Sequence, residues 1–123
     1  MIAQKFLNLY NSFSSIYNNQ YSSQTAYKLF LLKKQLTEHY DFLISREKQL
    51  LAQYNGIVEE DGKITFTSAE DQQQFINAHE ELTKVEIDLP ETKISMNLSE
   101  VKGNISPMEI ELLSEIICFK EEE

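Results

Sequence analysis

An unbroken stretch of helix-forming residues constrains this chain more than any other feature of its sequence. From Gln24 to about Tyr54 no glycine or proline occurs, and the stretch is rich in Leu, Lys, Gln and Glu. These residues favour helix, and Ser22 or Ser23 just before them can accept a backbone N–H as an N-cap. The stretch therefore predicts one long helix over residues 24–54, spanning roughly 45 Å at 1.5 Å per residue.

A leucine heptad runs along this predicted helix, at Leu29, Leu36, Leu43 and Leu50. The positions four residues further on are only half apolar: Lys33, Tyr40, Glu47 and Tyr54. The apolar seam is therefore narrow for a coiled coil. It either forms core within the chain, in a small helical bundle, or packs in part on another chain, because the helix is longer than a compact domain of this size needs. On the second interpretation Leu36, Tyr40, Leu43 and Leu50 contact the partner.

Residues before and just after the long helix form two further elements in the prediction. Apolar side chains at three- and four-residue spacings, from Phe6 to Tyr17, indicate an N-terminal helix over residues 3–17. Two β-prone runs flank Asp61-Gly62 and predict a β-hairpin over residues 57–66. A two-residue loop of type I′ would pair Glu60 with Lys63 and Ile57 with Phe66.

The last third of the sequence alternates between helix and strand signals. Capping boxes at residues 67–71 predict a helix over about 69–84, and alternating apolar residues predict short strands over about 85–89 and 94–98. Ser106, Pro107 and Glu109 open a C-terminal helix expected to reach about Phe119. The fold class is therefore α+β and predominantly helical.

Length and composition indicate a single domain over residues 1–123. The hydrophobic fraction is 41%, with only three glycines and two prolines, which is typical of a packed globular chain. We divide it into an N-terminal helix and polar loop (1–23), the long helix (24–54), an acidic α+β part (55–119) and an acidic tail (120–123). The single cysteine and the lack of long apolar runs predict a reducing cytoplasm and no membrane span.

Charge is divided unevenly along the chain. Residues 1–54 hold six Lys or Arg against three Asp or Glu, whereas residues 55–123 hold five against seventeen. Direct nucleic-acid binding is therefore disfavoured, since an overall charge of −9 repels phosphates and the lysines of the long helix do not form one stripe. The acidic half can instead attract a basic protein surface, and Glu59, Glu60 and Asp61 at the hairpin turn are its candidate contact residues.

Motifs that carry common chemistry do not occur in the sequence. His39 and His79 lie on separate predicted helices and outside any zinc-binding spacing. Cys118 neighbours apolar residues of the predicted C-terminal helix, which favours a buried structural thiol. Three scattered glycines cannot form a phosphate-binding loop. We therefore expect no catalytic residues, no cofactor and no metal, and a protein that is not an enzyme.

A series of short motifs in a fixed order resembles a known family. The motifs are residues 25–29, 46–51, 53–54, 59–64, 75–82, 85–87, 105–110 and 112–113. Together they are similar to the small phage and prophage proteins of Gram-positive bacteria grouped as domain of unknown function 1617. The resemblance covers nearly the whole chain except residues 1–23, where the family has a short strand-like segment and a proline-containing linker. It implies a phage protein located in the bacterial host cytoplasm during infection or lysogeny, or in the virion, and brings no catalytic residues.

Three functions remain open at this point. The first is a non-enzymatic protein that binds a protein partner of the phage or its bacterial host, in virion assembly or in the control of host machinery, with a possible homo-oligomer through the long helix. The second is an acidic inhibitor that occupies the DNA-binding surface of a host nucleic-acid enzyme or defence nuclease. The third is an enzyme with an unfamiliar site.

Overall fold

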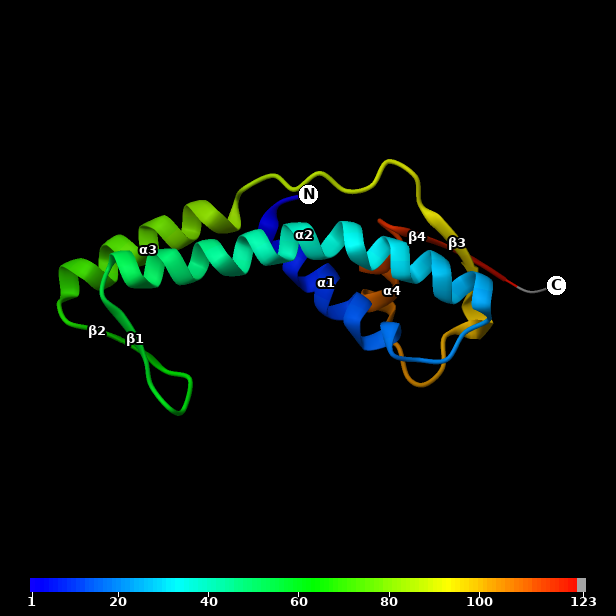
Figure 1. Ribbon diagram of the computed structural model, residues 1–123, viewed down its shortest axis with the longest axis horizontal. Coiled ribbons are helices and arrows are strands. Elements are labelled where there is room, and N and C mark those ends of the chain that lie inside the picture. The colour runs from blue at the N-terminus through cyan, green and yellow to red at the C-terminus, as the bar shows by residue number, and fades with distance from the viewer. Residues whose placement is uncertain (122–123) are drawn as a thin grey trace.

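The protein is an elongated α+β structure built along one helix. The computed structural model describes residues 1–121, and Figure 1 shows α2 running the length of the molecule with the other elements packed along it. In chain order the elements are α1 (Ala3–Tyr17), α2 (Ser23–Gln53), β1 (Gly56–Val58), β2 (Ile64–Phe66), α3 (Ala69–Thr83), β3 (Ile94–Asn97), the 3₁₀ turn η1 (Leu98–Glu100), α4 (Pro107–Leu113) and β4 (Ile117–Lys120). The predicted fold class and the long helix are confirmed.

Local capping signals fix where the helices begin and end. The Ser22 hydroxyl accepts the Thr25 N–H at 3.3 Å, so α2 begins at the predicted cap. Asn55 follows the helix with φ of +58°, a conformation that asparagine tolerates better than most residues. Ser68 caps α3 by accepting the Asp71 N–H, and Ser106 forms a full capping box with Glu109 at the start of α4.

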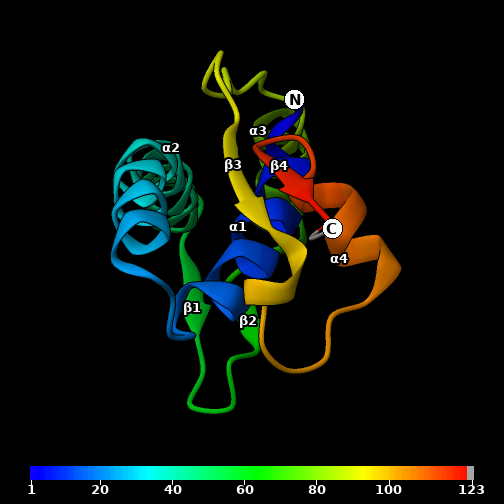
Figure 2. The same cartoon turned by 90° about the vertical axis from the view of Figure 1, so that its right-hand side faces the viewer.

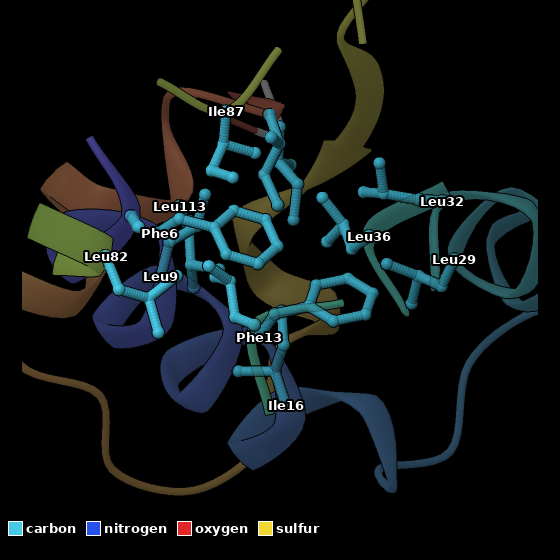
Figure 3. Close-up of a cluster of buried hydrophobic side chains, with 14 of the residues drawn as sticks. Phe6, Leu9, Phe13, Ile16, Leu29, Leu32, Leu36, Leu82, Ile87 and Leu113 are labelled. Carbon is cyan, nitrogen blue, oxygen red and sulfur yellow. The ribbon is translucent and has the colours of Figure 1, made fainter. Parts of the chain in front are cut away.

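The core lies on one side of α2, and α1 is at its centre. Figure 2 shows α1 between α2 and α4, with β3 and β4 above it. Figure 3 shows the side chains of α1 meeting the leucines of the first half of α2 and Leu113 of α4. The second half of α2 is covered by α3, which contributes Phe75 and Leu82 to the same cluster. Because α1 and α3 follow one another along α2, the long helix is covered on its inner side over most of its length.

The hairpin forms where it was predicted, but its register differs by one residue. Val58 pairs with Ile64 and Ile57 with Thr65, so the predicted Ile57–Phe66 pair is wrong. Three residues rather than two make the loop, since the Glu59 N–H donates to the Lys63 carbonyl at 2.7 Å. Gly62 has φ of +85°, as the last position of such a loop requires, and the Lys63 N–H binds the Asp61 carboxylate at 3.0 Å.

Two predictions for the last third of the chain are wrong. Residues 85–89 form a single antiparallel bridge, Ile2 with Glu86, because their partner is the short segment before α1. The helix that begins at Pro107 ends at Leu113 instead of Phe119, and residues 117–120 form β4, parallel to β3.

The C-terminal strand also changes the environment of nearby residues. Cys118 pairs in register with Ser95 and is exposed, so the expectation of a buried thiol is wrong. Residue 120 belongs to β4 rather than to the predicted tail, Glu121 is exposed, and the remainder of that tail lies outside the described residues.

Candidate protein-binding surface

The leucines proposed to contact a partner lie in the core of this chain. Leu36, Leu43 and Leu50 are 0%, 2% and 3% exposed. The Tyr40 ring stacks on that of Tyr10, with centroids 4.2 Å apart and an interplanar angle of 10°. These four side chains therefore hold α2 against the rest of the fold and do not form an accessible surface.

The three acidic candidates lie together at the tip of the hairpin. Glu59, Glu60 and Asp61 are all exposed, and Figure 1 shows the loop between β1 and β2 projecting from the body of the molecule. The Glu59 carboxylate accepts the Thr65 hydroxyl at 3.0 Å. One acidic side chain is thereby held across the hairpin, beside the two in the loop.

Apolar side chains leave the core along the same hairpin. At its base Phe66 packs on Phe75 of α3, with ring centroids 5.3 Å apart. Opposite residues of an antiparallel pair share a face, so Val58 and Ile64 extend the face of Phe66 outwards. Val58 is 59% exposed and Ile57, on the other face, is 54% exposed. The hairpin thus presents β-branched side chains to solvent on both faces, immediately behind three carboxylates.

Backbone groups of the hairpin are also available. The hydrogen bond from Glu59 to Lys63 makes that pair a bonded pair of the ladder, and bonded and non-bonded pairs alternate. Val58 and Ile64 therefore point their N–H and C=O groups away from each other, at the two edges of a two-stranded sheet. Such edges can accept a further strand.

A polar cluster at the start of α2 was not predicted. Both oxygens of Glu100 accept from the Thr25 hydroxyl, at 3.2 and 3.0 Å, and the Ser22 hydroxyl donates to one of them at 3.3 Å. Burial raises the pKa of the Tyr21 phenol above its ordinary value; a hydrogen bond with the Asn19 side chain opposes this, and the charge of Glu100 adds to it. A carboxylate at a helix N-terminus stabilises the helix dipole, so this cluster holds η1 against α2.

The two histidines are separate and each packs on an aromatic ring. His39 meets Phe6 edge to face, with centroids 5.9 Å apart, and His79 lies 5.5 Å from Phe75. The His79 Nε2 lies 3.6 Å from a carboxylate oxygen of Glu47. Within residues 1–121 no group of three or more His, Cys, Asp or Glu side chains is arranged to hold a metal ion.

The outer side of α2 carries exposed apolar side chains that the leucine heptad does not predict. Tyr27, Phe30, Leu31 and Phe42 are each more than 40% exposed. The Lys34 ammonium lies 5.0 Å from the centroid of the Phe30 ring. The heptad spacing identifies only the stripe that packs in the core. The apolar residues of the helix outside that heptad are the sequence signal for this second face.

Comparison of the chain with protein-family models, with curated proteins and with solved structures finds no match. None of the helices described by the structure is long and apolar enough to cross a membrane. We therefore infer a role from the surfaces themselves.

Proposed function

We propose that this protein acts by binding a protein partner through the hairpin β1–β2, without catalysing a reaction. The observation that carries this proposal is the exposure of Ile57 and Val58, both more than half accessible, on a hairpin that projects from the body of the molecule. Large exposed apolar side chains on a protruding element lose contact with water when a partner covers them, and this stabilises a complex.

The chemistry of the hairpin describes the partner it fits. An apolar centre with a charged rim is the usual anatomy of a specific interface. Here the rim is the three carboxylates at residues 59–61, so the matching surface carries Lys or Arg around an apolar patch. Electrostatic attraction of this kind chiefly raises the association rate and the specificity of binding.

The resemblance to the phage family supports a partner from the phage or its bacterial host. A role in virion assembly and a role in modulating host machinery both need a contact surface of this kind. The DNA-binding site of a host enzyme is one basic surface that the acidic tip fits. A protein that occupies such a site would inhibit the enzyme by displacing its DNA.

Photo-crosslinking tests the proposal. A benzophenone amino acid replaces Val58 in one variant and Ile76, an exposed residue of α3, in the control. We expect a discrete crosslinked partner from position 58 in extracts of the host and none from position 76. Crosslinking at position 58 is then repeated with Glu59→Lys/Glu60→Lys and, as a control of equal charge change, with Glu80→Lys/Glu81→Lys on α3.

Loss of the adduct only with the hairpin reversal supports the proposal. Equal loss of the adduct with both reversals would mean that the overall negative charge of the protein attracts the partner. An adduct that survives Glu59→Lys/Glu60→Lys would contradict the assigned surface. Adding duplex DNA to the purified complex identifies the kind of partner surface: DNA that competes with the hairpin indicates a DNA-binding site.

A further inference from the structure

The outer face of α2 carries an ordered set of side chains opposite the leucine stripe. Phe30, Leu31 and Phe42 are 43%, 42% and 55% exposed, and Lys34 and Glu38 between them are also exposed. At 100° per residue these five positions fall within about 120° of one another around the helix. Figure 2, viewed along the molecule, shows one side of α2 turned away from the other described elements, and the exposure of Phe30, Leu31 and Phe42 is consistent with a position on that side.

Reversing the direction of the helix keeps the apolar ends of the set in place and exchanges its two charges. From the N-terminal side the order is apolar (Phe30 and Leu31), basic (Lys34), acidic (Glu38) and apolar (Phe42). A face with this property is complementary to a second copy of itself that runs the opposite way.

We infer that α2 pairs with α2 of a second copy of this chain, antiparallel, about a two-fold axis near Leu36. In that arrangement Phe30 of each copy lies level with Phe42 of the other, with Leu31 one residue further on, and Lys34 lies level with Glu38. A two-fold axis repeats every contact, so the interface contains two such charge pairs and two such apolar pairs. The contact goes beyond the proposed function because it uses neither the hairpin nor any of its residues.

The charges on this face favour a second copy of the chain as the partner, and they favour antiparallel over parallel pairing. Parallel pairing would bring Lys34 against Lys34 and Glu38 against Glu38, and like charges in contact oppose association. Antiparallel pairing instead places Lys34 of each copy against Glu38 of the other. These two charge pairs are neutral in sum, although each chain carries a net charge of −9.

Grooves on both sides of the face can receive the side chains of the second copy. One, of about 370 Å³, lies towards α1 and is lined in part by Tyr17 and Phe30. The other, of about 290 Å³, lies towards the segment before β3 and is lined in part by Leu89 and Pro90. Lys34 and Glu38 line both grooves and form the ridge between them.

Charge reversal in two separate variants tests the pairing. Sedimentation equilibrium should show a dimer for the wild type, and Lys34→Glu or Glu38→Lys alone should raise its dissociation constant about a hundredfold, a factor of about ten for each of the two charge pairs. An equimolar mixture of the two variants should regain dimers, because the mixed pair again places opposite charges together. Lys63→Glu, an exposed reversal on the hairpin and therefore outside the face, should dimerise as the wild type does.

A second measurement fixes the direction of the helices. In a Cys118→Ser background, Leu31→Cys and Phe42→Cys chains should form disulfides with each other when mixed and not with their own kind. A wild type that stays monomeric, a mixture that stays monomeric while both variants keep their helix content by circular dichroism, or disulfides within either cysteine variant would each overturn the inference.

Discussion

Two leucines on opposite sides of α2 allow a direct measurement of what its inner side contributes. Leu36 is completely buried beside Phe6 and Phe13, whereas Leu31 is 42% exposed. Replacing either by alanine within the same helix leaves the change in helix propensity the same, so the difference reports packing alone. Leu36→Ala creates an enclosed cavity and should lower the free energy of unfolding by about 3 kcal/mol or more. Leu31→Ala opens onto solvent and should cost less than about 1 kcal/mol.

Urea unfolding followed by circular dichroism measures both values. The protein must be dilute enough to be monomeric, so that any effect of Leu31→Ala on self-association does not enter the free energy. Equal slopes of free energy against urea concentration confirm that the variants unfold from comparable states. Equal losses of stability for the two variants would refute the assignment of Leu36 to the core and Leu31 to the surface.

Two further measurements test the hairpin loop and the cluster at the start of α2. Gly62→Ala places a side chain at φ of +85° in open space, so its cost to the folded hairpin is conformational, about 1–2 kcal/mol. Amide hydrogen exchange at Glu59 should therefore accelerate by roughly fivefold to thirtyfold. Gly62→Asn should accelerate it less, because asparagine tolerates positive φ better than alanine. The folded-state pKa of Tyr21 is raised above 10.0, so its contribution to stability is complete below that pH and is lost as the pH rises through the folded value. Tyr21→Phe should therefore flatten the alkaline fall in the free energy of unfolding, measured in urea from about pH 8 to pH 11; an unchanged slope would contradict the role of burial.

Elements with strong local signals could be predicted from the sequence. The four helices begin where a serine cap or an apolar period indicated, and the long helix ends at Gln53, one residue before the predicted end. These features depend on residues within one or two turns, so a single sequence contains the information. The last helix shows the limit: Ile116, Ile117 and Phe119 fit a helical period and a strand equally well, and the pairing with β3, distant in sequence, decides.

The candidate surface could be predicted only in part. Residues 59–61 were selected by charge and do lie exposed on a projecting hairpin. The length of the helix predicts a contact of Leu36, Leu43 and Leu50 with another chain, but α1 and α3 cover these leucines within one molecule. The outer face of α2 required the structure, since exposure of an apolar residue depends on what the rest of the chain leaves uncovered.

The hairpin and the outer face of α2 are independent surfaces whose geometry combines. Residue 56 follows the centre of the inferred contact by 20 positions, which is about 30 Å along a helix, so an antiparallel dimer would hold its two hairpins roughly 60 Å apart at opposite ends. Two sites on one rigid body convert the second binding event into an intramolecular one when the partner repeats at a matching distance. Lys34→Glu would then weaken binding to a repeating partner while leaving the affinity of a single hairpin unchanged, because the two positions share no contacts and their effects add. The two surfaces together therefore favour a partner that is a repeating assembly, because only such a partner can bind both hairpins of one dimer.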